Sequence, residues 1–85
     1  MLYDRLFKCD VNQRPIPNTS AIVEKSITED SIYFSGKDIP MLSLGIGDYV
    51  YFEMGENENP DKLFVVELFI TYDMIKCTTP PINEE

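Results

Sequence analysis

Alternation of apolar and polar side chains is the main pattern along this chain. It is clearest over Asp48–Met54, where the two kinds of residue occupy alternate positions. The apolar positions are Val50, Phe52 and Met54. The opposite positions are Tyr49, Tyr51 and Glu53. A period of two is typical of a strand with one buried face, so this segment predicts a strand that presents its tyrosines outward.

A longer apolar segment, Leu63–Cys77, follows. Its even positions form an unbroken apolar face: Phe64, Val66, Leu68, Ile70, Tyr72 and Met74. Its β-branched and aromatic residues favour a strand over a helix. As one straight strand it would be about 50 Å long, at about 3.3 Å per residue. We therefore expect it to bend or break near Thr71–Asp73.

The first 28 residues predict two strands separated by a loop. Residues 1–11 alternate, but Arg5 interrupts their apolar side, which favours an edge strand. Residues 12–18 contain two prolines, and these predict a loop because proline cannot donate a ladder hydrogen bond. Ser20–Ile27 is the next predicted strand.

A hairpin and an irregular segment complete the middle of the chain. Residues 28–30 are polar and predict a tight turn, after which Ser31–Ser35 returns as a strand. Residues 39–46 are apolar but contain Pro40 and Gly45, so they predict an irregular, packed loop.

No segment has the pattern of an amphipathic helix of ten residues. The prediction is an all-β fold, a small antiparallel barrel of about five strands with little or no helix. Residues 1–77 would form a single domain and residues 78–85 a flexible acidic tail. The predicted core is Leu6, Ile22, Ile27, Ile32, Phe34, Leu44, Val50, Phe52, Phe64, Val66, Leu68 and Ile70.

The negative net charge of the chain excludes some classes of binding partner. The 85 residues carry a net charge of −8. Residues 1–40 hold five basic and six acidic side chains, net −1, and residues 41–85 hold two basic and nine acidic, net −7. Direct nucleic-acid binding needs clustered basic groups, and an anionic leaflet would repel this chain. Two interpretations remain: a solubilising surface, or a carboxylate surface directed at a basic protein.

The residue types that the chain lacks exclude several kinds of catalytic and metal site. The chain has no His, which excludes Ser-His-Asp and Cys-His catalysis and His-ligated metals. Cys9 and Cys77 are the only cysteines. They are expected to be buried, reduced thiols, or a disulfide if the end strands pair. No leader peptide precedes the first strand, so we expect a cytoplasmic protein.

One cluster of carboxylates and one pair of tyrosines are the candidate site. The carboxylates are Glu53, Glu56, Glu58 and Asp61, and they fit a solvated loop, a partner contact or a weak calcium site. Tyr49 and Tyr51 suit a protein contact, with cross-strand packing as the alternative. Gly45-Ile46-Gly47 begins like a phosphate-binding fingerprint, but a strand follows it, so a turn is the better interpretation. We predict a partner-binding surface without metal or cofactor.

A central stretch resembles a known family. Ser26-Ile27-Thr28-Glu29-Asp30-Ser31-Ile32-Tyr33-Phe34, with Gly47-Asp48-Tyr49-Val50-Tyr51-Phe52 after a loop, is similar to the hairpin and following strand of PilZ domains. These are six-stranded barrels that bind cyclic di-GMP. At the fixed positions of their [DN]-x-S-x-x-G motif stand Ser26, Thr28 and Ser31, which keep one hydroxyl. Their R-x-x-x-R motif is absent, since Asn18 lies four residues after Arg14. The resemblance implies a degenerate regulatory domain that acts through protein contacts.

The function that these patterns favour is a non-enzymatic, acidic interaction module. In its sharper form it is an inhibitor or adaptor of a basic, nucleic-acid-handling protein. The alternatives are a degenerate PilZ-type sensor, an enzyme, and a structural subunit of an assembly.

Overall fold

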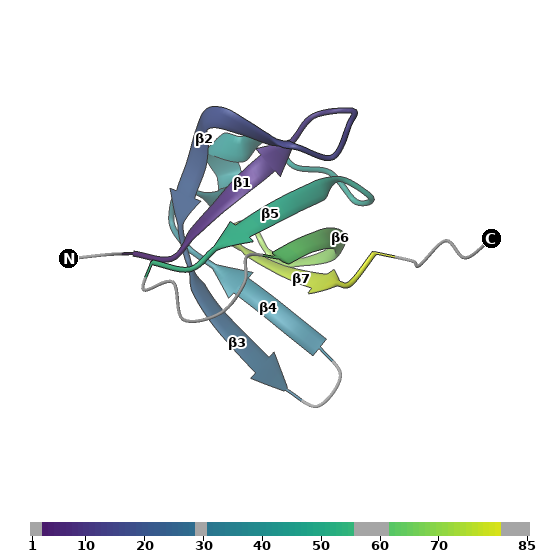
Figure 1. Cartoon of the computed structure of the whole chain (residues 1–85). Helices are drawn as coiled ribbons and strands as arrows, with labels where there is room; N and C mark the ends of the chain where they lie inside the picture. Colours follow the sequence, from purple (N-terminus) through teal and green to yellow (C-terminus); the bar gives the residue numbers. More distant parts are fainter. Residues whose placement is uncertain (1–2, 29–30, 56–61, 81–85) are drawn as a thin grey trace.

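The computed structural model describes residues 3–28, 31–55 and 62–80 (Figure 1). In these residues all strands pair antiparallel, which confirms the all-β prediction. They comprise seven strands rather than five: β1 (Arg5–Cys9), β2 (Pro15–Ile22), β3 (Glu24–Thr28), β4 (Ser31–Ser35), β5 (Tyr49–Glu53), β6 (Lys62–Thr71) and β7 (Met74–Thr78). One sheet of order β2-β1-β5-β6-β7-β4-β3 curls into a half-barrel.

A single bent strand joins the two edges of this sheet. β2 and β3 are separated only by Val23, yet they occupy opposite ends of the sheet order. Side chains alternate without interruption through the bend, since Ala21 and Val23 are both buried. The predicted strand Ser20–Ile27 is therefore two strands, because the chain leaves β1 at Val23 and pairs with β4 from Glu24 onward. Figure 1 shows the β3–β4 hairpin projecting beyond the rest of the sheet.

Two predictions near the N-terminus were wrong. The segment expected as an edge strand contains β1, which lies between β2 and β5. The expected loop over residues 12–18 becomes strand from Pro15. β2 accommodates Pro15 and Pro17 because it is itself the edge strand, where an N–H need not be donated to a neighbour.

The predicted break in the last apolar segment is confirmed, since β6 ends at Thr71 and β7 begins at Met74. The prediction that Leu68 and Ile70 are buried was wrong; they are 37% and 46% exposed. The pairing of β6 with β7 shifts between Val66 and Leu68 and again between Phe69 and Thr71. Each bulge adds one residue to β6 and reverses which face the following side chains occupy. Leu68 is therefore opposite Lys76 rather than a core residue.

Ile22 and Ile27 were also wrongly assigned to the core. Ile22 is 42% exposed because the buried positions of the bent strand are odd-numbered and are occupied by Ala21 and Val23. Ile27 is also odd-numbered and lies opposite Ile32, on the same face of the strand as Val23. It is nevertheless 61% exposed, because the hairpin projects past the barrel.

The observed core combines predicted and unpredicted residues. Predicted residues that are buried are Leu6, Phe34, Val50, Phe52, Phe64 and Val66, and Ile32 and Leu44 pack against them partly buried. Buried residues that are absent from the predicted core list are Cys9, Ala21, Val23, Ile39, Leu42, Ile75 and Cys77, although the two cysteines were expected to be buried. The ring centroid of Phe34 lies 5.0 Å from that of Phe52 and 5.5 Å from that of Phe64. These aromatic pairs hold β4, β5 and β6 together across the half-barrel.

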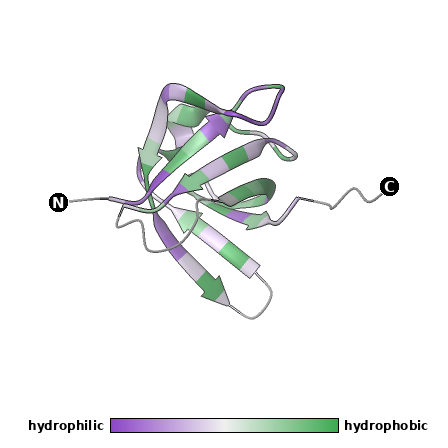
Figure 2. Cartoon of the chain, viewed as in Figure 1, coloured by the Kyte–Doolittle hydropathy of each residue, from purple (hydrophilic) through white to green (hydrophobic). Residues whose placement is uncertain are grey.

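A short 3₁₀ helix, η1 (Ile39–Leu42), packs against β2. Ile39 and Leu42 are buried, which confirms the expectation of a packed, irregular segment there. Apolar and polar residues alternate along most strands in Figure 2. η1 and the strand faces thus share one core.

Candidate functional site

The three described members of the predicted site lie on the outer face of β5. Val50 and Phe52 point into the core, so Tyr49, Tyr51 and Glu53 point away from it, as the alternation predicted. Both tyrosines are half-buried and Glu53 is exposed. Glu56, Glu58 and Asp61 lie outside the described residues.

Strand register surrounds the two tyrosines with apolar neighbours. Tyr51 is opposite Phe7 of β1 on one side and Leu63 of β6 on the other. Tyr49 is opposite Val65 of β6. These five half-buried side chains form what we call the β5 outer strip: Phe7, Tyr49, Tyr51, Leu63 and Val65. The sequence pattern did not indicate Phe7, Leu63 and Val65, because cross-strand neighbours depend on a register that joins distant segments.

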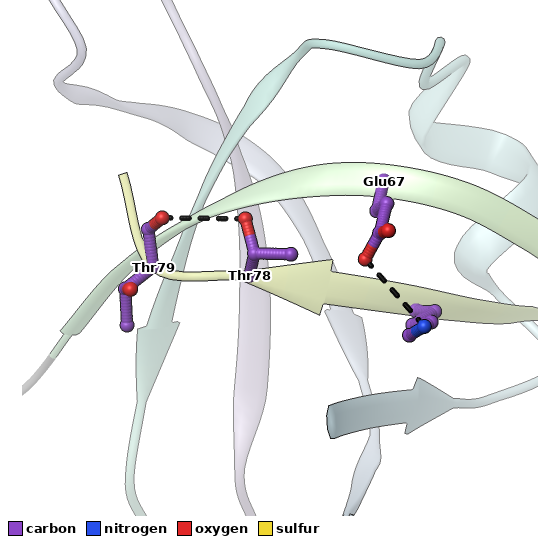
Figure 3. A network of polar contacts seen from close by, with 4 residues as sticks. Glu67, Thr78 and Thr79 are labelled. Atoms are coloured by element: carbon purple, nitrogen blue, oxygen red, sulfur yellow. Dashed lines mark hydrogen bonds and ion pairs between the residues drawn. The ribbon is translucent and has the colours of Figure 1, made fainter. Parts of the chain in front are cut away.

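Charge lies at both margins of the strip. Glu53 is opposite Arg5, two pairs along β1 from the Phe7–Tyr51 pair. On β6, the Glu67 carboxylate oxygen Oε1 lies 3.7 Å from Lys76 Nζ of β7, and both side chains are partly exposed (Figure 3). Such an exposed pair contributes at most about 1 kcal/mol to stability. In the same view Thr78 Oγ1 donates a hydrogen bond to the Thr79 carbonyl.

The Gly45–Asp48 segment is a turn, as expected. Asp48 donates its N–H to the Gly45 carbonyl, and Gly45 donates its N–H to Asp48 Oδ2 at 2.8 Å. Gly47 adopts a φ of 95°, a left-handed conformation that favours glycine. Its N–H is donated to Val66 of β6, so this turn fixes the start of β5.

A shallow pocket of about 260 Å³ lies between β2 and η1. Its lining residues are Asn18, Thr19, Ser20, Asp38, Met41 and Leu42. Thr19 Oγ1 is already used, donating to the Ile16 carbonyl at 2.7 Å. The volume is below the roughly 300–1,000 Å³ of usual ligand sites. No sequence pattern indicated this pocket, because packing of η1 on β2 creates it.

The two cysteines are buried, free thiols, as one of the two sequence interpretations held. Burial, with a smaller contribution from Asp10, raises the pKa of the Cys9 thiol to about 11. Burial, with a smaller contribution from Glu67, raises the pKa of Cys77 to about 12. Neither thiol is therefore a nucleophile near neutral pH, because the thiolate is the reactive form.

The residues that resemble the PilZ motif occupy the projecting hairpin. Ser26 and Thr28 lie on β3 and Ser31 on β4, with Thr28 opposite Ser31. Arg14 directly precedes β2, so most of the bent strand separates it from this hairpin. The structure does not gather these residues into one site.

Within the described ranges, no cluster of three potential metal ligands is present. No helix in this part of the chain is long and apolar enough to cross a membrane. Comparison of the chain with family models, curated proteins and solved structures found no match.

Proposed function

We propose that this protein is a non-enzymatic interaction module that binds a basic protein through the β5 outer strip. The supporting observation is the register that places Phe7, Tyr51 and Leu63 side by side on the outside of the sheet. Aromatic residues on an exposed sheet face provide contact area together with a polar group. Such residues are enriched at protein interfaces.

Electrostatics favours a cationic partner. Glu53 beside the strip is opposite Arg5, so the acidic excess comes from the whole of residues 41–85, which include β5 and β6 and carry a net charge of −7 from nine acidic and two basic side chains. An acidic surface accelerates encounter with a basic one and disfavours acidic competitors. Proteins that handle nucleic acids have such basic surfaces. An inhibitor or adaptor of a protein of that class is therefore the sharper form of the proposal.

The proposal is tested by capturing partners from the source cell with three bait proteins. These are the wild type, Tyr49→Ser in the strip, and Tyr72→Ser as a matched control. Tyr72 is 77% exposed and precedes β7, outside the strip. We expect Tyr49→Ser to lower the affinity for a recovered basic protein about tenfold or more, as for an interface hot spot. The control should bind like the wild type.

Salt provides a second measurement on the same complex. Exposed charges are screened over about 8 Å at physiological ionic strength, so affinity should fall as salt rises. An affinity that is equal for wild type and Tyr49→Ser would contradict the role of the strip. An affinity that does not change with salt would mean that the carboxylates keep the protein soluble and do not contribute to binding.

A further inference from the structure

β3 is an open edge of the sheet. It is the last strand in the sheet order and pairs only with β4 among the described residues. All five of its residues are exposed. Its ladder with β4 is regular from the Glu24–Ser35 pair to the Thr28–Ser31 pair, without a bulge. An edge of this kind is a template for another strand.

The direction of the β3 backbone groups follows from one hydrogen bond of the next strand. Gly36, directly after β4, donates its N–H to Asp73, directly before β7. Since N–H groups along a strand point to alternate sides, Phe34 and Ile32 also face β7. The odd-numbered residues of β4 therefore direct their N–H and C=O groups toward β3. Their register partners on β3 direct their own N–H and C=O groups toward β4. Those partners are Glu24, Ser26 and Thr28. Lys25 and Ile27 then direct their N–H and C=O groups to the open side.

A hydrogen bond at the bend independently indicates the same direction for the polar groups of Lys25 and Ile27. Val23 donates its N–H to the Asp4 carbonyl, toward β1. Lys25 and Ile27 are two and four residues further along the same bent strand, so their polar groups point to that same side. β1 begins at Arg5 and no longer accompanies the bent strand there.

Among the described residues, the opposite edge of the sheet has backbone protection that β3 lacks. β2 contains Pro15 and Pro17, which lack an N–H, and Asn18 adopts a left-handed φ of 76°. η1 also packs against β2. Proline, local distortion, covering segments and charged side chains are devices that prevent strand addition at an edge, and of these the described residues give β3 only the charged Glu24 and Lys25. β3 has no proline.

We propose that the open edge of β3 binds an extended, cationic segment of a partner protein by strand addition. Lys25 and Ile27 offer one N–H and one C=O each to the incoming strand. Its side chains would alternate, with apolar ones beside Ile27 and basic ones beside Glu24. This proposal concerns a different surface from the β5 outer strip and does not depend on that strip.

Charge on the hairpin selects the occupant. Lys25 directs its Nζ over the Phe52 ring, 4.9 Å from the ring centroid, so this cation faces the protein. Glu24 is exposed on the other face of β3, and Glu29 and Asp30 follow β3 in the sequence. A second copy of the chain also carries −8 and would be repelled. A basic strand is attracted.

The test uses amide-resolved NMR with a blocked heptapeptide of alternating lysine and valine as the probe. In the free protein, the amides of Lys25 and Ile27 should exchange with solvent faster than that of Ser26, which is bonded to β4. We expect saturable binding of the peptide that slows exchange at Lys25 and Ile27. Ile27→Pro should weaken this binding about 2- to 13-fold, the loss expected for one hydrogen bond. Ile27→Thr is the matched control that keeps the N–H.

Two further probes separate the causes. A peptide with N-methylated valines cannot form the ladder and should not bind, which keeps the test decisive if Ile27→Pro does not fold. A peptide with glutamate in place of lysine should bind more weakly than the lysine peptide.

Four outcomes would overturn the proposal. They are absence of saturable binding, shifts confined to β5, equal binding of the N-methylated peptide, and equal binding of the glutamate peptide. Protection of Lys25 that grows with protein concentration alone would assign the edge to a second copy. Tyr49→Ser should leave peptide binding unchanged, so failure of the β5 outer strip proposal is distinguishable from failure here.

Discussion

Replacement of Gly36 by alanine tests whether the bend between β2 and β3 is as tightly packed as the structure indicates. A Cβ atom at Gly36 would lie 2.4 Å from the Ile22 carbonyl oxygen and 3.4 Å from Val23 Cα. Both neighbours are backbone atoms, so no side-chain rotation relieves the contact. The Ile22 carbonyl would have to move by about 1 Å to reach ordinary van der Waals distance.

The expected loss of stability combines three contributions. Overpacking of a tight site costs about 1–3 kcal/mol. The hydrogen bond from Gly36 N–H to the Asp73 carbonyl, 3.0 Å long, would be weakened, at a cost of about 0.5–1.5 kcal/mol. Alanine restricts the unfolded chain more than glycine does, and this offsets the loss of stability by about 0.4–1 kcal/mol. The net destabilisation is therefore about 0.5–4 kcal/mol, and each kcal/mol lowers Tm by about 4–8 °C at this chain length.

Gly45→Ala provides the matched control. The nearest atom to a Cβ at Gly45 is Asp48 Oδ2 at 3.7 Å, an ordinary contact. This variant should be unchanged or stabilised by up to about 1 kcal/mol. Urea unfolding followed by far-UV circular dichroism measures both variants. Equal stability of Gly36→Ala and Gly45→Ala would refute the close approach at the bend.

Two further predictions concern the thiols and a candidate ligand. Because burial raises the pKa values of Cys9 and Cys77 from 9.0 to about 11 and about 12, the unfolded state releases these protons first as pH rises. Their effect on stability is therefore nil below about pH 9, and they destabilise the fold between about pH 9 and 12. Urea midpoints at pH 8 and 10.5 should fall further in the wild type than in the Cys9→Ala/Cys77→Ala double variant, and equal falls would contradict the shifts. Cyclic di-GMP should not bind usefully, because the only arginines are Arg5, on β1, and Arg14, directly before β2, and neither belongs to an R-x-x-x-R motif. Isothermal titration that gave a dissociation constant below about 10 μM would overturn this expectation and favour the PilZ-type alternative.

Local patterns predicted the elements that depend on local interactions. The strand expected over Asp48–Met54 is β5, Tyr49–Glu53, and the break near Thr71–Asp73 is the β6–β7 connection. Both have strong sequence signals: strict alternation in one, and a length too great for a single strand in the other. The outward orientation of Tyr49, Tyr51 and Glu53 was predictable for the same reason.

Long-range pairing and bulges were not predictable in this way. The bulges of β6 fall in a segment whose even positions are all apolar and whose odd positions mix Glu67 and Thr71 with Phe69, so alternation alone did not predict the change of face that exposes Leu68. The position of β1 between β2 and β5 depends on pairing of Arg5 with Glu53, far along the chain. The β5 outer strip and the open edge of β3 both result from such pairings.

The bent strand has a consequence for the order in which the chain can fold. It belongs to two hairpins, β1–β2 and β3–β4, whose partners are close in sequence. The β5–β6–β7 meander must then insert between these hairpins, with Arg5 meeting Glu53 on one side and Ile32 meeting Cys77 on the other. Isolated two-stranded hairpins are at best marginally stable. The pairing of β1 with β5 and the pairing of β4 with β7 must therefore form together. We expect folding on the millisecond-to-second scale of proteins with mostly non-local contacts.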